Sequence, residues 1–487
     1  MYFTSNKRQH LVFLLSLVAG FLAFYFRWKA LGQTEYVNGW DGYFYLIQLR
    51  AWIETGAMHS PDASLIYPFM GSLYLFIEDY VLAYKMTAAI LSSAFVLLIF
   101  AVARRWGASF YLAGLLASIS LFSPQLTYFA AQYPKNLLGM TLLLGFFWSV
   151  GHQWKILPLL FLLLNYFGHR LSFGLALIFI IVYFLSQRFT WRQLAWASFV
   201  LLCIVSLGLL LPGLLHWTDF ERLEGLLSKM PHFSPYSFVQ EFGKERLTML
   251  WGMEIGMSCV VFFGALFFLF QKKKDARFLG LLAICTFLVF PFFKWSLTSF
   301  SYRFFLVFVL LAPCLSIFYF PQGKRWNKVY GMLILILVGM SGYSYQAYQP
   351  QLHDPHYKRY AGITKKAMEV LEKGQTELVI AHPALAEFFT FTTQIDAMPW
   401  LPEYEIADRK LWRIAAGVRA PLLAYYLTEE EKTSTFRLAL RYYLIREATW
   451  QKMLATIKEE DLASYQELSG WKNPNRIRPS FLLRKKQ

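Results

Sequence analysis

The chain has 487 residues, of which 57% are apolar and 19% aromatic, while only 16% are charged. This composition places it among polytopic membrane proteins. The formal charge of +17 would suit a nucleic-acid partner, but the basic residues lie mostly between apolar runs, which is a topology signal of membrane proteins. No nucleic-acid partner is therefore expected. The four cysteines all lie inside apolar runs and form no CxxC pair, which excludes a disulfide framework.

Eleven apolar runs reach or approach the roughly 20 residues that a helix needs to cross a bilayer. They lie at 10–27, 84–103, 108–130, 136–151, 156–168, 171–187, 194–215, 253–270, 278–293, 304–320 and 329–347. No acid lies in the middle of a run, and Glu254 is the only one near the start of a run. The predicted fold class is mainly α, a polytopic membrane protein of about 11 transmembrane helices.

Basic residues gather in alternate connections between these runs. With the N-terminus in the cytoplasm, the short outside connections hold only Lys135, Arg170, Lys294 and Arg303. The positive-inside rule supports this orientation, and an odd number of spans then puts the C-terminal region outside. We expect a multi-pass protein of the cell inner (plasma) membrane, with a cytoplasmic N-terminus.

Two outside connections are long, at 28–83 and 216–252, and the region 348–487 lacks a span. Patterns in that region predict helices at 360–373 and 447–469 and strands at 377–381, 441–446 and 480–484. We therefore expect two domains. These are a transmembrane domain at 1–347 and a small extracytoplasmic α/β domain at 348–487.

The first outside connection holds Asp41 between Gly39-Trp40 and Gly42-Tyr43, just ahead of an interfacial helix predicted at 42–53. An acid held partly desolvated beside aromatic rings has a pKa suited to general-base work. The simpler interpretation is that Asp41 caps this helix. Spacing alone favours the cap, and the two roles do not exclude each other.

Cations lie at separate outside connections. Lys135 follows Pro134 between the third and fourth spans, where it could bind a phosphate or extend to lipid headgroups. His169 and Arg170 join two short spans, and polar groups at such a depth suggest function, with plain headgroup contact as the alternative. Arg303 begins a late span and suits either a lipid phosphate or a generic interfacial anchor.

Other motifs are absent or weak. The sequence has no P-loop, no GxGxxG after a strand, no HExxH and no Gly-x-Ser-x-Gly. The acid pair Glu78-Asp79 could bind a divalent cation, but one pair offers too few oxygen ligands, and exposure to water ahead of the second span is favoured. No metal site is predicted.

In their order, the pieces resemble the GT-C superfamily of membrane glycosyltransferases, which includes protein mannosyltransferases, aminoarabinose transferases of lipid A and catalytic subunits of oligosaccharyltransferases. The first span is followed by an outside loop with an acid ahead of aromatic residues, Asp41-Gly42-Tyr43-Phe44-Tyr45. A helix end at Ala51–Gly56 and the turn Tyr67-Pro68-Phe69 follow. Ala103–Gly107 resembles the cytoplasmic end of the second span, and Ser301-Tyr302-Arg303-Phe304 resembles an arginine-led late span.

The resemblance implies an inverting transfer of a sugar from a polyprenyl-phosphate or -pyrophosphate carrier to a lipid, glycan or protein acceptor at the outer membrane face. It implies that Asp41 is the catalytic base. The residues implied to hold the carrier phosphate are Arg303, Lys135, His169 and Arg170. The residues implied to line the donor and acceptor pocket are Trp40, Tyr43, Tyr67 and Tyr302.

The sequence also departs from the family. Many relatives carry a second acid between the third and fourth spans, where this chain has Gln132-Tyr133-Pro134-Lys135-Asn136. The Trp-Trp-Asp-Tyr-Gly signature of oligosaccharyltransferases is missing. Both departures disfavour a divalent metal, so no cofactor is expected. The alternatives are a flippase or transporter for lipid-linked glycans, a metal-dependent oligosaccharyltransferase-like enzyme, and a non-catalytic scaffold that binds cell-wall polymers.

Overall fold

A computed structural model describes much of the chain. The described residues are 3–38, 41–59, 62–150, 156–186, 232–233, 249–270, 293–294, 298–352, 357–370, 378–381, 383–399, 422–425, 465–471 and 480–485. The chain divides into two compact units. The first is formed by Met1–Glu35 and Ala63–His353, and the second by Tyr36–Asp62 and Asp354–Gln487. The segment that carries Asp41 thus belongs to the same unit as the C-terminal region.

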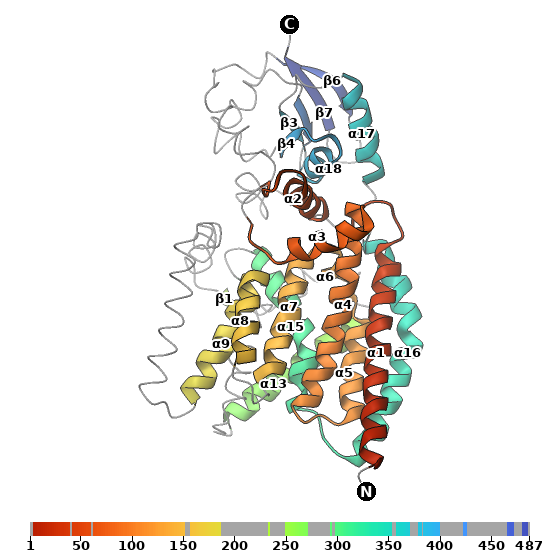
Figure 1. The fold of residues 1–487 in the computed structure, drawn as a ribbon, viewed down its shortest axis with the longest axis vertical. Helices are drawn as coiled ribbons and strands as arrows, with labels where there is room; N and C mark the ends of the chain where they lie inside the picture. The colour runs from red at the N-terminus through yellow and green to blue at the C-terminus, as the bar shows by residue number, and fades with distance from the viewer. Residues whose placement is uncertain are drawn as a thin grey trace. The chain divides into compact units, whose positions relative to one another are not determined.

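The first unit is a bundle of apolar helices (Figure 1). Its described helices are α1 (Phe3–Leu31), α3 (Ile66–Ile77), α4 (Tyr80–Arg105), α5 (Phe110–Phe122), α6 (Pro124–Gln132), α7 (Pro134–Val150), α8 (Ile156–Gly168), α9 (Arg170–Ser186), α13 (Met249–Phe270), α15 (Thr298–Leu315) and α16 (Lys324–Leu352). A short antiparallel pair, β1 (His232–Phe233) with β2 (Phe293–Lys294), also belongs to this unit.

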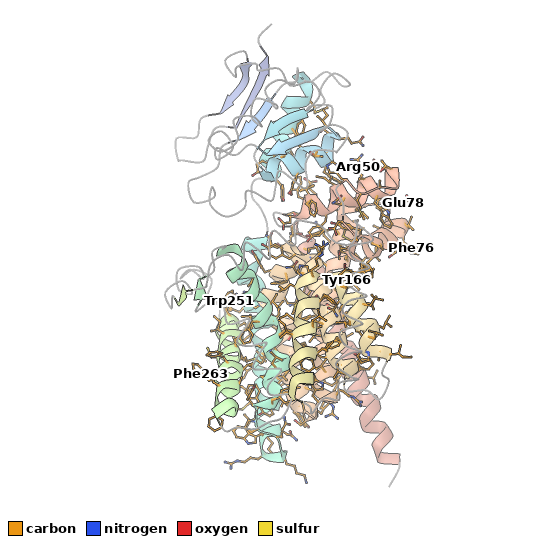
Figure 2. All side chains as sticks on the ribbon, turned by 90° about the vertical axis from the view of Figure 1, so that its left-hand side faces the viewer. Arg50, Phe76, Glu78, Tyr166, Trp251 and Phe263 are labelled. Carbon is orange, nitrogen blue, oxygen red and sulfur yellow. The ribbon has the colours of Figure 1, made fainter. Side chains whose placement is uncertain are left out.

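The length and composition of these helices suit a bilayer. Among the described residues, α1, α4 and α13 are long and apolar enough to cross it, and α5 with α6 would form a fourth crossing despite a 50° bend between them. Large apolar side chains face outwards, as lipid would require: Phe263 on α13 is 62% exposed and projects away from the bundle (Figure 2). The chain is therefore a multi-pass membrane protein.

α4 lies at the centre of the first unit, where it packs against α1, α5, α7 and α3. Its N-cap is Asp79, whose carboxylate accepts a hydrogen bond from the Leu82 amide at 2.9 Å. Glu78 and Asp79 are both exposed, which confirms the favoured interpretation of this acid pair. No group of three or more metal-ligating side chains occurs within the described residues.

The sequence predicted one continuous span at 108–130. In the structure this span is broken between α5 and α6. Ser123 ends α5 and begins α6, and its hydroxyl accepts a hydrogen bond from the Leu126 amide at 3.0 Å. Pro124 has no amide hydrogen to continue the helix. The guanidinium of Arg27 on α1 donates to the carbonyls of Ser120, Leu121 and Ser123, so the exposed ends of the broken helix are paired.

Other predicted spans that fall on described residues are helical, with shifted ends. α13, for example, begins at Met249, four residues before the predicted start. The predicted span at 194–215, and that at 278–293 except for Phe293, lie outside the described residues. A total of eleven spans therefore stays a prediction. α3 was not predicted as a helix, because Pro68 was interpreted as a turn signal, whereas proline fits the first turn of a helix.

The second unit combines helices with short strands. Its described elements are α2 (Gly42–Thr55), α17 (Tyr357–Val370), β3 (Leu378–Ala381), α18 (Pro383–Thr393), β4 (Asp396–Pro399), β5 (Leu422–Tyr425), β6 (Tyr465–Trp471) and β7 (Ser480–Lys485). β3 and β4 run parallel, and α18 is the crossover between them. β7 lies between β5 and β6 in an antiparallel sheet. The described elements of this region include both helices and strands, and the α/β domain at 348–487 stays a prediction.

The strands predicted at 377–381 and 480–484 are confirmed within one residue, and the helix predicted at 360–373 begins three residues earlier. The end of the helix predicted at 447–469 is wrong, because Tyr465 to Ser469 belong to β6. Their backbone groups pair with β7, a partner that local periodicity does not reveal. The rest of that helix and the strand predicted at 441–446 lie outside the described residues.

Close helix packing in the first unit depends on Gly139 of α7. A Cβ atom at this position would overlap the Cβ of His169 and the hydroxyl of Ser172 on the α8–α9 side. Small residues of this kind let helix backbones approach closely in membranes. We expect Gly139→Ala to lose about 1–3 kcal/mol of stability through overpacking. Thermal unfolding of the detergent-solubilised protein measures this loss.

Gly174→Ala in α9 is the matched control, because a Cβ there meets no atom within 4 Å. Alanine stabilises a helix by up to about 1 kcal/mol relative to glycine, so this variant should unfold at the same or a higher temperature. Equal stability of the two variants would contradict the close approach at Gly139.

Candidate functional site

Asp41 stands directly before α2, at its N-cap position, and is half-buried. Its backbone has φ −87° and ψ 2°, and its side chain makes no capping hydrogen bond. The prediction that the Asp41 carboxylate caps the helix is therefore wrong, because an effective N-cap needs an extended backbone to turn its oxygen back to the helix amides. The carboxylate of Asp41 is not used for capping.

α2 itself forms as predicted. It extends over Gly42–Thr55, and its buried positions include Tyr43, Leu46 and Leu49, which recur at helical spacing. The helix ends at Gly56, whose φ of 73° is a left-handed conformation that favours glycine. Local sequence therefore fixes the helix that carries Asp41.

α18 covers one side of α2 with aromatic rings. The Tyr43 ring meets the rings of Tyr357 and Phe388 edge-on, with centroids 5.0 Å apart in both pairs, and the Phe391 ring lies 5.5 Å away. Such edge-to-face pairs add about 0.5–1.5 kcal/mol each to the burial of the rings. Tyr43 was predicted to line a substrate pocket, but it is only 3% exposed, and its ring packs between helices.

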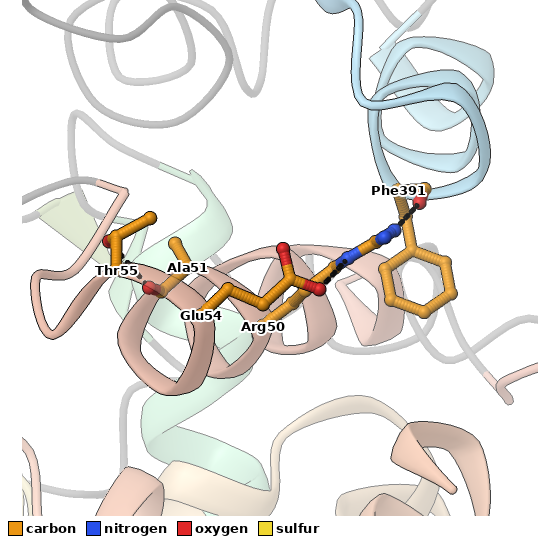
Figure 3. Close-up of polar contacts among 5 residues, drawn as sticks. All are labelled: Arg50, Ala51, Glu54, Thr55 and Phe391. Atoms are coloured by element: carbon orange, nitrogen blue, oxygen red, sulfur yellow. Dashed lines mark hydrogen bonds and ion pairs between the residues drawn. The ribbon is translucent and has the colours of Figure 1, made fainter.

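Arg50 joins the same two helices farther along α2 (Figure 3). Its guanidinium donates to the Phe391 carbonyl at 2.7 Å and to the Glu54 carboxylate, also at 2.7 Å. It also lies 5.7 Å from the centre of the Phe391 ring. The Phe391 carbonyl is near the C-terminal end of α18, where carbonyl groups lack helix partners and favour a cation.

Glu387 on α18 meets the first turn of α2. Its carboxyl group accepts a hydrogen bond from the backbone amide of Phe44 and lies close enough to Asp41 to feel its charge. Burial first, and the Asp41 charge second, hold the pKa of Glu387 well above its usual range, although the Phe44 amide acts in the opposite direction. Two acids from distant parts of the sequence thus form a pair at the start of α2.

Glu387 was not predicted as a site residue. The available signal was an isolated acid in the apolar stretch Ala384–Phe391, four residues before Phe391 and therefore on the same helix face. Its partner, however, is defined by the packing of α18 on α2. A single sequence contains no spacing rule that joins these two segments.

One of the predicted phosphate-binding residues, His169, packs against α7 in the first unit. Gly139, one turn after Lys135 on α7, approaches His169 at the α8–α9 junction. This junction is also held to the start of α3, since the Leu65 amide donates to the Phe167 carbonyl at 2.9 Å and the Ser64 hydroxyl to the Gly168 carbonyl at 3.1 Å.

The remaining predicted site residues are distributed as follows. Arg170 begins α9 beside His169, and its charge acts on Tyr166 (labelled in Figure 2). Tyr67 lies in the first turn of α3 and is fully buried. Arg303 and Tyr302 lie in the second turn of α15, but their side chains are outside the described part of the chain, as is the whole of Trp40.

Two solved structures are similar to this chain. The crystal structure of ArnT from Cupriavidus metallidurans bound to undecaprenyl phosphate has a TM-score of 0.49 and 12% identity, covering 98% of this chain and 98% of that one. The cryo-EM structure of the arabinofuranosyltransferase AftD from Mycobacteria has a TM-score of 0.49 and 11% identity, covering 98% of this chain but 40% of that one, so this chain spans less than half the length of AftD. No family model and no curated protein matches the chain.

The packing of α2 on α18 can be tested at Arg50. Arg50→Met removes the hydrogen bond to the Phe391 carbonyl, and a bond from a charged donor contributes about 1.5–3 kcal/mol. We expect faster amide hydrogen exchange in α18 and faster proteolytic cleavage of the second unit. Glu54→Gln is the control, because this side chain is 44% exposed and surface ion pairs contribute only about 0–1 kcal/mol. Equal exchange in the two variants would show that Arg50 does not hold α18.

Proposed function

We propose that the chain is an integral-membrane glycosyltransferase that moves a sugar from a polyprenyl-(pyro)phosphate carrier to an acceptor at the outer membrane face. Asp41 is the base in this proposal. The observation that supports it is the position of Asp41 before α2, where its carboxylate is half-buried, takes no part in capping and is paired with a second acid. Catalytic bases are commonly prepared by such partly desolvated carboxyl pairs.

The proposed reaction needs one proton acceptor. Asp41 takes the proton of an acceptor hydroxyl, whose oxygen then forms a bond to the anomeric carbon of the sugar. The bond from that carbon to the phosphate oxygen breaks, and the carrier leaves as a phosphate anion. Attack opposite the leaving group inverts the configuration of the sugar.

Cations at the outer ends of the helices would stabilise the departing phosphate. The proposed set consists of Lys135, His169, Arg170 and Arg303. His169 packs against α7 at Gly139, one turn after Lys135, and Arg170 follows His169 at the start of α9. Positive charges close to a leaving phosphate lower the activation barrier of the transfer, because negative charge develops on the phosphate in the transition state. We propose that this occurs in the inner membrane, with the N-terminus in the cytoplasm, and without a cofactor.

A transporter or flippase of lipid-linked glycans is the second candidate. Arg27 and Glu254 are both buried among the helices, and ionisable groups within spans often mark transport paths. Here Arg27 binds backbone carbonyls at the α5–α6 break, which supports a structural role. Movement of a lipid-linked sugar across vesicles by the purified protein, without any sugar transfer, would favour this candidate.

Asp41→Asn tests the proposed base. The amide cannot accept the proton, so we expect the rate of sugar transfer to fall by about 10²–10⁴-fold, the usual contribution of general-base catalysis. Purified protein, prenyl-phosphate sugars and candidate acceptors provide the assay, with product detected by mass spectrometry. Glu54→Gln, on the same helix, should transfer at the wild-type rate. A folded Asp41→Asn protein with wild-type transfer would exclude Asp41 as the base.

Arg303→Ala tests the proposed phosphate site. Loss of a charged donor to the carrier phosphate should weaken donor binding about 10-fold or more, given that bonds to charged groups contribute about 1.5–3 kcal/mol. Binding of the prenyl-phosphate sugar to protein in nanodiscs measures the effect. The control is Lys324→Ala, at the exposed start of α16. Unchanged donor affinity of the Arg303 variant would remove this residue from the site.

A further inference from the structure

We propose that Glu387 is a positioning residue for Asp41: it holds the first turn of α2 in place of a side-chain cap, and the two carboxyl groups carry a single negative charge between them. The inference deepens the proposed function and rests on it for the role of Asp41. Its structural half, the bond from α18 to α2, stands on contacts within the second unit alone.

The backbone amides in the first turn of α2 need acceptors from outside the helix. The first four amides of a helix have no acceptor within the helix. Asp41 does not supply one with its side chain, whereas the Glu387 carboxyl group accepts from the Phe44 amide. The usual local cap is thus replaced by a group from another helix. Because the bond crosses from α18 to α2, it also fixes the position of the residue before α2, which is Asp41.

The burial of Glu387 also limits the charge that Glu387 and Asp41 can carry together. One carboxyl oxygen of Glu387, Oε2, is buried and accepts no hydrogen bond from the described residues. A buried ionised carboxylate without full hydrogen bonding is costly, and a second carboxylate beside it increases the cost. One proton on the pair avoids this cost. Because burial and the Asp41 charge both raise the pKa of Glu387, we assign the shared proton to Glu387.

Among the side chains that the structure describes, no cation is found to act on Glu387. The titratable or charged residues on the elements packed against α18 are Asp41, Tyr43, Tyr45, Arg50 and Glu54 on or beside α2, Tyr357, Lys358, Arg359, Tyr360, Lys365, Lys366 and Glu369 on α17, and Asp396 in β4. Among the described contacts, Arg50 is bound to Glu54 and to the Phe391 carbonyl. Lys358 and Lys365 are exposed. Asp41 is the charged group that acts on Glu387.

A dependence on pH follows. The pKa of Glu387 is raised in the folded protein, so the folded state binds its proton more tightly than the unfolded state. The resulting stabilisation is fully present below the unfolded pKa of about 4.3 and is lost as the pH rises through the raised folded pKa. Ionisation of Glu387 then places two negative charges at the start of α2, which should loosen its first turn and slow transfer.

The experiment compares Glu387→Gln and Glu387→Ala with wild type, using full-length protein in nanodiscs. Amide hydrogen exchange in the first turn of α2 and the rate of sugar transfer are both measured from about pH 5 to about pH 9, a range above the ordinary pKa of a glutamate. Glutamine keeps an oxygen for the Phe44 amide but cannot ionise. Alanine removes both functions. Glu54→Gln is the matched control on α2.

In wild type, we expect protection of the first turn, and the rate of transfer, to decline at the alkaline end. Glu387→Gln should keep the protection and lose this alkaline decline. Glu387→Ala should lose protection about tenfold at every pH, as expected for the loss of a helix cap. The kcat should fall more than the KM rises, because a misplaced base affects the chemical step.

Two outcomes would overturn the inference. If both Glu387 variants match wild type in exchange and in pH profile while Asp41→Asn is inactive, Glu387 does not position the base, although the proposed function stands. If wild type transfers no sugar from any prenyl-phosphate donor, the proposed function fails and with it the catalytic half of the inference. In that case the exchange data alone decide whether Glu387 caps α2.

Discussion

The helix break between α5 and α6 is the constraint on which the first unit depends. In lipid, every backbone polar group must be paired within the protein. Ser123 and Pro124 interrupt the span formed by α5 and α6, and Arg27 pairs the carbonyls that the break exposes. Glu254 on α13 accepts a hydrogen bond from Ser123 and interacts electrostatically with Arg27. The helices α1, α5, α6 and α13 are thereby joined at this break. Loss of one partner of such a buried network typically lowers the free energy of unfolding by about 3–5 kcal/mol.

The same requirement operates on a smaller scale in the second unit. The first turn of α2 needs acceptors, and an acid on the crossover helix α18 supplies one at Phe44. Arg50 binds the Phe391 carbonyl farther along, so α2 is bound to α18 near both ends. The aromatic rings of Tyr43, Phe388 and Tyr357 fill the space between. The helix that follows the proposed base is thus held by several contacts within the second unit.

The parts of the fold that could be predicted are those determined by residues close together in the sequence. α2 was predicted at 42–53 and forms over Gly42–Thr55, because its apolar spacing and Gly56 are both local signals. β7 was predicted within one residue for the same reason. The side-chain role of Asp41 was wrong, and Glu387 was missed, because each depends on a partner far along the chain. The bend at Ser123 had a local signal in Ser-Pro, but an unbroken apolar run obscured it.

The position of Glu387 bears on the second acid that is missing between the third and fourth predicted spans. The connection between the third and fourth predicted spans lacks the second acid that many members of the GT-C superfamily, which the sequence resembles, carry there. In the structure the second acid comes from the C-terminal region and meets Asp41 at the start of α2. A carboxyl group that keeps its proton adds no charge, so it would not repel an anionic carrier as a second carboxylate would. Under the proposed function, such a pair would let the base meet a phosphate-bearing substrate with one negative charge in place of two.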